Sequence, residues 1–254
     1  MLRRRIIPAL LMRDGGLVKT IKFSKERYIG DPINAVKIFN EKEVDELCLL
    51  DIGATKEGRP PAYKEINEIV SEAFMPIGYG GGIQNMEHVE RLFKIGVEKV
   101  IMNTAAFENE NLVKEASSVY GSQSIVVSID IKKDLWGQYK IFTRSGKSKQ
   151  KLDLITAVKK MQELGAGEII LNNIDRDGTM QGYDLDPISK AGKVLDVPLV
   201  ALGGAAKIDD FVEAIQSGAA AVSAGSMFVY QGIHKAVLIS YITSDNLEQR
   251  LQNQ

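Results

Sequence analysis

The stretch GYGGGI, residues 78–83, ends a short apolar run in glycines, and LGGAAK, residues 202–207, repeats this pattern later in the chain. Two other pairs of segments match at nearly the same separation, about half the chain: VIMNTAAF (100–107) with AVSAGSMF (221–228), and LLDIGAT (49–55) with NNIDRDGT (172–179). Self-similarity at a fixed separation is the signature of a structure built from repeated units. The repeat therefore predicts a fold made of two similar halves.

Short apolar runs alternate with amphipathic segments along the whole sequence. The runs predict strands at residues 4–12, 46–51, 75–80, 98–103, 124–130, 168–173, 197–202 and 219–224. The amphipathic segments, with apolar residues spaced as on one face of a helix, predict helices at 34–43, 62–74, 86–96, 111–121, 153–165, 186–194, 208–218 and 232–242. Eight strands alternating with eight helices is the pattern of an α/β (β/α)8 TIM barrel. The alternative, a doubly wound open sheet, lacks support because its usual GxGxxG turn is missing.

The two halves are expected to form one domain, residues 1–254, because no linker or low-complexity segment divides them. The half-barrels would cover about residues 1–122 and 123–243, in keeping with the repeat. The polar tail, residues 245–254, is expected to form a surface helix or a frayed end. The run YKIFTR, residues 139–144, predicts a small hairpin inserted after the fifth strand, with Trp136 at its tip.

Composition narrows the class of protein. The chain has 32 basic and 33 acidic residues, a formal charge of −1, which gives no support for a nucleic-acid partner. No stretch approaches the roughly 18 apolar residues that would span a membrane. The first apolar run is too short for a signal peptide, and the lone Cys48 cannot form an internal disulfide. These features predict a soluble, cytoplasmic protein.

The candidate functional residues follow the predicted strands, because active sites of TIM barrels lie at the carboxyl ends of the strands. Glycines follow the third and seventh strands, where backbone N–H groups could approach an oxyanion closely. Polar residues and a further glycine follow the neighbouring fourth and eighth strands. Each half thus predicts one phosphate cradle, formed by Gly82, Asn103 and Thr104 in the first half and by Gly203, Gly204, Gly225 and Ser226 in the second. The alternative is that these glycines only make tight turns.

Acid–base chemistry between the two cradles would fall to carboxylates. His88 and His234 both lie in predicted helices away from the strand ends, so no metal ligand cluster is expected. The fifth strand, IVVSIDIKKD, ends in Asp130, whereas the matching position in PALLMRDGG is Leu11. Asp51 and Asp175 follow other strands. A carboxyl group that is partly buried at a barrel mouth can act as an acid or a base because burial raises its pKa.

The chain resembles the cyclase subunit of imidazole glycerol phosphate synthase over nearly its whole length. The resemblance rests on RRIIPALLMRDGGLVK, GGGI, NTAA, GSQSIVVSID, SGK, GAGEIILNNIDRDGTMQGYD and GGAAK. It implies a (β/α)8 barrel that receives ammonia from a separate glutaminase subunit and uses it on a bis-phosphorylated ribonucleotide, with no cofactor. It also implies roles for Lys19, in the loop after the first strand, for Asp51, and for Asp177 and Gly178 beside the second phosphate site.

Two positions depart from the family pattern. The family carries catalytic aspartates at the ends of the first and fifth strands, and here the first of these is Leu11. Position 202 is Leu where the family commonly has Ser. A leucine cannot transfer a proton, and loss of a general acid or base typically lowers a rate by about 10²–10⁴-fold. The usual cyclase chemistry is therefore in question.

The opposite end of the barrel resembles the ammonia entrance of the family. Charged residues stand at the starts of the first, second, fourth and sixth strands: Arg5, Glu46, Lys99 and Glu168. Two cations facing two anions can form a salt-bridged gate that a small neutral molecule could pass. Generic charged capping of the barrel end is the alternative.

These features favour a diverged paralogue that docks a glutaminase as a heterodimer at the amino-terminal face of the barrel. The ammonia would then serve amidination of sugars in surface-polysaccharide (lipopolysaccharide) synthesis, with a separate sugar amidotransferase. Three alternatives stay open. The chain is an authentic cyclase in which Asp130 alone, or with Asp51, suffices; it is the sister isomerase of histidine synthesis; or it is a non-catalytic module that activates a glutaminase.

Overall fold

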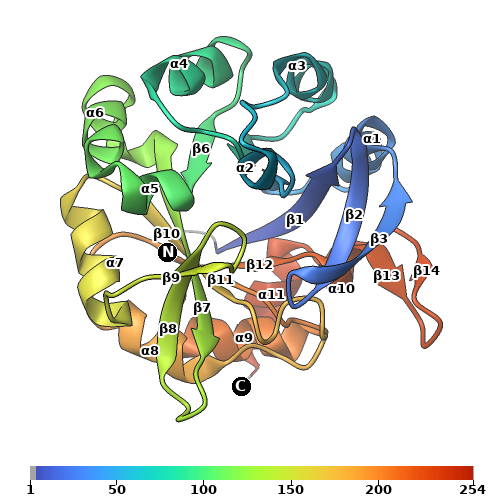
Figure 1. The fold of residues 1–254 in the computed structure, drawn as a ribbon. Helices are drawn as coiled ribbons and strands as arrows, with labels where there is room; N and C mark the ends of the chain where they lie inside the picture. Colours follow the sequence, from blue (N-terminus) through green and yellow to red (C-terminus); the bar gives the residue numbers. More distant parts are fainter. Residues whose placement is uncertain (1–3, 254) are drawn as a thin grey trace.

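The computed structural model describes residues 4–253 and contains a closed barrel of parallel strands surrounded by helices (Figure 1). The barrel strands, in spatial order, are β1 (Arg5–Arg13), β4 (Leu47–Asp51), β5 (Ile77–Gly80), β6 (Lys99–Met102), β7 (Ile125–Lys133), β10 (Glu168–Asn173), β11 (Leu199–Leu202) and β12 (Ala221–Ala224). The sheet closes because β7 pairs with β10 and β12 pairs with β1. The predicted TIM barrel is confirmed, and each predicted strand overlaps one of these strands.

The strands are short apolar runs because both of their faces are covered. Outward-facing side chains pack against the helices. Inward-facing side chains form a separate apolar cluster inside the barrel, with Ile7, Cys48, Val126, Ile170 and Val200 among its members. The barrel interior is therefore a packed column of apolar side chains between two polar ends.

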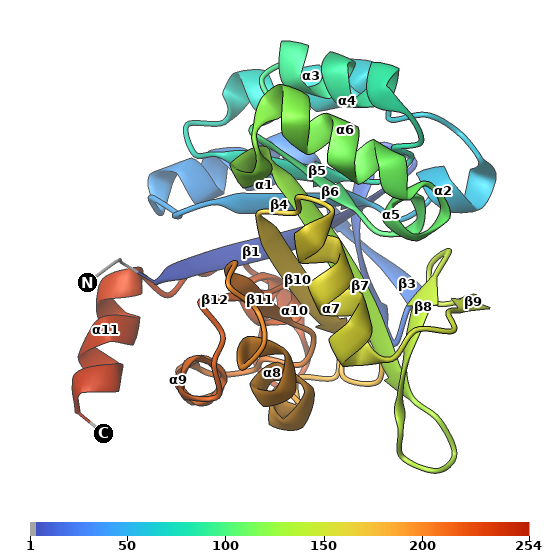
Figure 2. The same cartoon turned by 90° about the vertical axis from the view of Figure 1, so that its left-hand side faces the viewer.

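Helices cover the outside of the barrel (Figure 2). The longer ones are α1 (Pro32–Glu41), α3 (Tyr63–Glu72), α4 (Met86–Lys94), α6 (Glu110–Tyr120), α7 (Leu154–Glu163), α8 (Leu185–Gly192), α9 (Ile208–Gln216) and α11 (Ser244–Gln252). Asp31, Asn85 and Asp153 begin α1, α4 and α7 by accepting hydrogen bonds from backbone N–H groups of the first turn. Four short helical segments are α2 (Ala54–Glu57), α5 (Thr104–Glu108), η1 (Ser122–Ser124) and α10 (Ser226–Val229). No helix within residues 4–253 is long and apolar enough to cross a membrane.

The helix predicted at residues 232–242 is wrong. This segment contains a small hairpin of β13 (Tyr230–Gln231) and β14 (Ala236–Val237), and Gly232 and Lys235 in its turn have positive φ angles of 69° and 50°. His234 therefore lies in an exposed turn rather than in a helix. The last helix is α11, in the polar tail as predicted, and it begins where Thr243 and Asn246 cap each other.

A longer hairpin follows the first strand of each half of the barrel. The hairpin after β7, made with β8 (Tyr139–Thr143) and extended by β9 (Ser148–Lys149), is confirmed, and Trp136 at its tip is exposed. The hairpin after β1, made of β2 (Gly16–Ile21) and β3 (Ser24–Gly30), was not predicted. Lys19, expected in a loop, lies in β2 and is buried, because β2 pairs with β1 above the barrel mouth.

The strand register aligns the two halves. Ile7 of β1 and Val126 of β7 both point into the barrel, where they belong to the inner apolar cluster. Counting the same number of residues onward from Ile7 and Val126 leads to Leu11 and Asp130, and Leu11 pairs with β4 as Asp130 pairs with β10. The pairings of β6 with β7 and of β12 with β1 join the two halves into one sheet.

Candidate functional site

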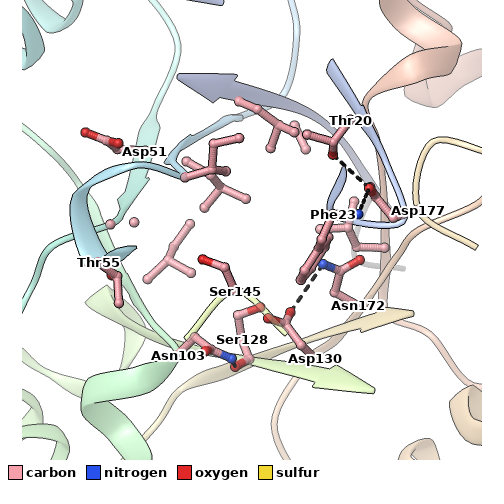
Figure 3. A pocket seen from close by; sticks show the side chains of 18 of the residues that line it. Thr20, Phe23, Asp51, Thr55, Asn103, Ser128, Asp130, Ser145, Asn172 and Asp177 are labelled. Carbon is pink, nitrogen blue, oxygen red and sulfur yellow. Dashed lines mark hydrogen bonds between the residues drawn. The ribbon is translucent and has the colours of Figure 1, made fainter. Parts of the chain in front are cut away.

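A cavity of about 520 Å³ opens at the carboxyl ends of the barrel strands (Figure 3). It brings together many of the predicted residues: Leu11, Lys19, Asp51, Gly82, Asn103, Thr104, Asp130, Asp177, Gly178, Gly203, Gly204, Gly225 and Ser226. Both predicted cradles thus border the same cavity. Asp175 lies apart, and its carboxylate accepts a hydrogen bond from the backbone N–H of Lys133.

One side of the cavity floor is polar. Asp130 and Asn172 face each other across the β7–β10 pair, and the amide nitrogen of Asn172 donates to Asp130 at 3.2 Å. Burial raises the pKa of Asp130 to about 7, although hydrogen bonds from Asn172 and Ser128 partly oppose this shift. A carboxyl group with this pKa exists in both protonation states near neutral pH, so it can give or take a proton.

The other side of the floor is apolar. Leu11 of β1 pairs with Leu50 of β4, and Leu202 of β11 pairs with Asn172 of β10. Leu11 is 9% exposed and Leu202 is 8% exposed, so both are nearly buried at the base of the cavity. Position 11 therefore supplies an apolar contact where the other half of the barrel supplies a carboxyl group.

Lys19 reaches across the mouth from the β2–β3 hairpin. A Cβ atom placed on Gly225 would lie only 1.9 Å from the Lys19 Nζ atom, so this ammonium group occupies the space that the glycine leaves. Burial lowers the pKa of Lys19, and the charge of Asp177 opposes that shift. The cation is thus positioned directly at the second predicted cradle.

The second cradle combines that cation with a tight backbone turn. Gly203 and Gly204 have positive φ angles of 97° and 120°, and a Cβ on Gly204 would meet the carbonyl of Gly182 at 2.3 Å. Ser226 begins the short helix α10 next to Gly225. This cradle offers a backbone turn, a helix start and an ammonium group to an oxyanion.

Asp177 and Gly178 hold the β2–β3 hairpin in place. The carboxylate of Asp177 accepts a hydrogen bond from the Thr20 hydroxyl at 2.9 Å, and its carbonyl accepts one from the Lys22 N–H at 3.0 Å. A Cβ on Gly178 would lie 2.0 Å from the Thr20 carbonyl. Both residues therefore position the strand that carries Lys19.

The first cradle is built on Gly82, Asn103 and Thr104. Gly82 has a φ of 70°, and a Cβ there would lie 2.7 Å from the Arg59 carbonyl. The side-chain amide of Asn103 donates to the Ser128 carbonyl at 2.9 Å, which fixes the strand end. The Thr104 hydroxyl accepts a hydrogen bond from the Arg144 N–H at 2.9 Å. The loop after β8 is thereby docked at the edge of the first cradle.

Asp51 borders the cavity, but its carboxylate is turned away from the centre (Figure 3). It accepts two hydrogen bonds from Arg59, at 2.8 and 3.0 Å, and two from the backbone N–H groups of Gly53 and Ala54. All these contacts stabilise the turn into α2. The geometry gives Asp51 an organising position next to Gly81 rather than an approach to the centre of the cavity.

At the opposite end of the barrel the four predicted charged residues form one ring. Arg5 donates to both Glu46 and Glu168. Lys99 donates to Glu46 at 2.8 Å and to Glu168 at 3.4 Å. The two carboxylates are nearly buried, so each of them depends on both cations for compensation. The ring closes the end of the apolar column.

Several cavity residues were not among the predicted site residues: Thr20, Phe23, Thr55, Arg144, Ser145 and Asn172. Asn172 could have been found, because it stands near the end of the predicted strand at 168–173, as Asp130 does in its own. Thr20 and Phe23 could not be found without the unpredicted hairpin. Among residues 4–253 no group of three or more His, Cys, Asp or Glu side chains is placed to bind a metal ion.

Comparison with known proteins identifies the family of this chain. A sequence profile described as "Histidine biosynthesis protein" matches residues 5–235. The chain belongs to the histidine biosynthesis family. Within this family it is 50% identical to a Leptospira interrogans protein provisionally named imidazole glycerol phosphate synthase subunit HisF, over 98% of each chain.

Other members of the family show the same relationship. A Pseudomonas aeruginosa protein, provisionally named subunit hisF2 of the same synthase, is 47% identical over 98% of this chain and 99% of its own. A Petrotoga mobilis protein named imidazole glycerol phosphate synthase subunit HisF is 40% identical over 93% and 94%. The resemblance to the cyclase subunit is therefore confirmed over nearly the whole chain.

Proposed function

We propose that this chain is a HisF-like subunit that receives ammonia from a glutaminase and conducts it through its barrel without cyclising a substrate. The main support for this proposal is the difference between the two ends of the apolar column inside the barrel. The charged ring at the entrance is complete, whereas the exit has Leu11 at the position that matches Asp130.

The ring and the column together suit a small neutral molecule. The side chains above the ring, including Ile7, Cys48 and Ile170, are apolar, so an ion that entered the column would lose its hydration without compensation. Ammonia is uncharged and about as large as water, so it can pass where ammonium cannot. A rearrangement of Lys99 within the ring would open the way, because Arg5 alone still contacts both carboxylates.

The exposed side chain of Phe74 supports docking of the glutaminase at the entrance. Phe74 is 89% exposed and precedes β5, so it lies at the amino-terminal face of the barrel. Asn40 accepts a hydrogen bond from the Phe74 N–H at 2.9 Å and donates to the Glu72 carbonyl at 2.7 Å, which fixes the loop. Exposed aromatic side chains are enriched at protein interfaces.

The phosphate cradles support a phosphorylated ligand at the other end of the barrel. Lys19 and Gly225 supply the second cradle, and Gly82 and Thr104 supply the first. A molecule with phosphates at both ends would lie across the cavity floor, over Asp130 on one side and Leu11 on the other. We propose that such a ligand is bound but not cyclised, since the floor offers one carboxyl group in place of two.

We further propose that the ammonia serves an acceptor enzyme that amidinates a sugar for a surface polysaccharide. A conduit without its own cyclisation chemistry needs an acceptor enzyme beyond its exit, which supports this proposal. An authentic cyclase is the second candidate, and the pKa of Asp130 near 7 favours it, because that group could serve as the single acid and base.

The test combines the purified chain with a purified glutaminase subunit of the imidazole glycerol phosphate synthase type. The proposal predicts a complex in which glutamine hydrolysis is activated and free ammonia appears in step with glutamate. Adding the bis-phosphorylated ribonucleotide of the cyclase reaction should leave that ammonia yield unchanged. Disappearance of the ammonia into an imidazole product would contradict the proposal, and so would a failure to form the complex.

A further inference from the structure

Two large apolar side chains stand side by side at the tip of the hairpin that joins β7 to β8. Leu135 is 97% exposed and Trp136 is 83% exposed. The tip extends away from the barrel and from the neighbouring helix α8 (Figure 2). Apolar side chains scattered singly over a surface are ordinary, whereas adjacent ones at a projecting tip point to contact with a partner.

Hydrogen bonds hold the tip in one conformation. The Asp134 carboxylate accepts hydrogen bonds from the backbone N–H groups of Trp136 and Gln138, at 3.0 and 2.9 Å. The N–H of Gly137 donates to the Asp134 carbonyl at 3.0 Å, and Gly137 has a positive φ of 77°. The turn is therefore already ordered, so presenting Leu135 and Trp136 to a partner costs little conformational entropy.

The same segment is strongly basic. The whole chain has a formal charge of −1, but residues 132–151 contain a single acidic residue, Asp134, beside seven basic ones: Lys132, Lys133, Lys140, Arg144, Lys147, Lys149 and Lys151. Within residues 4–253, the ion pairs of these seven are Lys133 with Asp184, Lys140 with Asp134 and Arg144 with Glu108. The segment therefore keeps a positive charge that the rest of the protein does not neutralise.

Two of the lysines lie close behind the apolar tip. Lys132 is directly opposite Lys140 in the β7–β8 pair, so both side chains share one face of the hairpin. This pair lies about 7 Å from the turn, at about 3.3 Å per strand residue. Like charges in this arrangement repel each other. An anionic partner that covers the tip would relieve the repulsion.

A bilayer that contains anionic lipids offers both kinds of contact. Tryptophan is enriched where a membrane meets water, because its ring is apolar and its N–H group can reach polar headgroups. Lysines next to such an anchor are attracted by the negative potential of the membrane surface. Peripheral binding of this kind requires no membrane-spanning helix.

The shape of the tip favours a membrane over a partner protein. A specific protein interface buries about 800 Å² on each partner, and two side chains on a narrow turn supply only part of that area. A bilayer deforms around a convex tip. Each basic side chain near an anionic bilayer also adds about fivefold in affinity, which corresponds to about 1 kcal/mol.

We infer that the β7–β8 hairpin binds the surface of an anionic membrane, with Leu135 and Trp136 inserted among the headgroups and Lys132 and Lys140 beside the lipid phosphates. This binding is independent of the proposed function, because no residue of the phosphate cradles or of the charged ring takes part. A glutaminase, a ribonucleotide and an acceptor enzyme are therefore unnecessary for its test.

The experiment uses the fluorescence of Trp136, which is the only tryptophan of the chain and so reports directly on the tip. The purified full chain is titrated with vesicles of phosphatidylcholine and phosphatidylglycerol in equal parts, and vesicles of phosphatidylcholine alone are the control. The anionic vesicles should give a saturable blue shift that high salt weakens. No shift with these vesicles would overturn the inference and leave the tip to a partner protein, and an equal shift with both kinds of vesicle would overturn it too.

A pair of variants tests the apolar contact. Leu135→Ser should weaken binding to the anionic vesicles by about tenfold, because the leucine no longer leaves water, while Trp136 still gives the signal. Ile233→Ser is the control, since Ile233 is 90% exposed in the turn of another hairpin. Its affinity should equal that of the unmodified chain. Equal affinities of all three proteins would overturn the insertion of the tip.

A second pair tests the charge. Replacing both lysines, Lys132→Gln with Lys140→Gln, should weaken binding by about 25-fold, from two factors of about five. Lys64→Gln removes a lysine with a side chain that is 90% exposed in α3, and it should change the affinity little. The same loss in both proteins would show that net charge alone matters and would overturn the assignment to this hairpin.

Discussion

Leu11 and Asp130 occupy equivalent positions in the two halves of the barrel. Leu11 pairs with Leu50 across β1 and β4, and Asp130 pairs with Asn172 across β7 and β10. The same register thus holds an apolar pair in the first half and a polar, hydrogen-bonded pair in the second. The two halves therefore share a backbone register at the mouth of the barrel but differ in the side chains that they place there.

The raised pKa of Asp130 predicts a specific dependence of stability on pH. Its pKa rises from 3.8 in the unfolded chain to about 7 in the folded chain. The folded state therefore holds the proton more tightly, and this contribution to stability is lost as the pH rises from about 4 through 7. The shift of about 3 pKa units corresponds to about 4 kcal/mol as an upper bound.

The variant Asp130→Asn should remove this dependence. Relative to the unmodified chain, Asp130→Asn should have a higher free energy of unfolding at pH 8. This gain should be larger than the change at pH 5 by about 2–4 kcal/mol. Urea denaturation at the two pH values measures both. Asp153→Asn is the control, because the pKa of the exposed Asp153 is lowered by its hydrogen bonds to Thr156. Both pH values lie above the range in which Asp153 titrates, so Asp153→Asn should change the free energy of unfolding equally at pH 5 and at pH 8. Parallel pH profiles for the unmodified chain and Asp130→Asn would refute the assignment.

Removing one cation from the charged ring at the amino-terminal end of the barrel should destabilise the protein. Lys99→Met leaves Glu46 and Glu168 nearly buried with Arg5 as the remaining cation of the ring, and breaking such a pair typically costs about 3–5 kcal/mol when it is fully buried. Because Lys99 is partly exposed, we expect a loss of about 1–3 kcal/mol. Lys64→Met, at a position that is 90% exposed, should change stability by less than about 0.5 kcal/mol. Equal losses would show that the ring has no special energetic role.

A methyl group at Gly225 should disrupt the second cradle. The new Cβ would collide with Lys19 Nζ and would also lie 2.9 Å from the Ala9 carbonyl, so the ammonium group must move. We expect Gly225→Ala to weaken binding of the bis-phosphorylated ribonucleotide by about 10–100-fold, as lost charge-assisted contacts predict. Isothermal titration calorimetry measures this, and Lys19→Met should give a loss of similar size. Unchanged affinity in both variants would show that the second cradle does not bind the ribonucleotide.

Truncation of Phe74 should weaken the glutaminase complex. An exposed aromatic anchor typically contributes about 2 kcal/mol or more when it is buried in an interface, so Phe74→Ala should raise the dissociation constant by about 30-fold. Trp136→Ala removes an equally exposed aromatic side chain from the hairpin at the other end of the barrel. Its complex should be as tight as that of the unmodified chain. The reverse ranking would place the glutaminase at the exit face.

The barrel itself could be predicted from the sequence because its period is regular, but the hairpins show where such prediction ends. The turn between β1 and β2 is Asp14-Gly15, both with positive φ, and Asp-Gly is a strong hairpin signal that could have been used. The turn between β2 and β3 is Lys22-Phe23, with φ angles of 53° and 59°. Such residues rarely adopt this conformation, so the sequence carries no signal for the second turn.

The residue types at the candidate site could be predicted from the sequence, but several of their contacts could not. Glycines after strands and a lone aspartate are visible in the sequence, so the place of these residues at the mouth of the barrel could be predicted. The engagement of Asp51 with Arg59 was not visible, because it depends on the path of the loop after β4. The helix predicted at residues 232–242 was wrong because its apolar spacing fits a helix, whereas Gly232 and Lys235 close a turn.

The most direct test of the central claim is cyclase turnover by the purified chain with the bis-phosphorylated ribonucleotide and saturating ammonium, beside the variant Leu11→Asp. Ammonium bypasses the glutaminase, so only the chemistry at the exit is measured. We predict no turnover by the natural chain and measurable turnover by Leu11→Asp, since the loss of one acid–base group accounts for about 10²–10⁴-fold in rate. Turnover by the natural chain at the rate of an ordinary cyclase would contradict the account and show that Asp130 alone suffices.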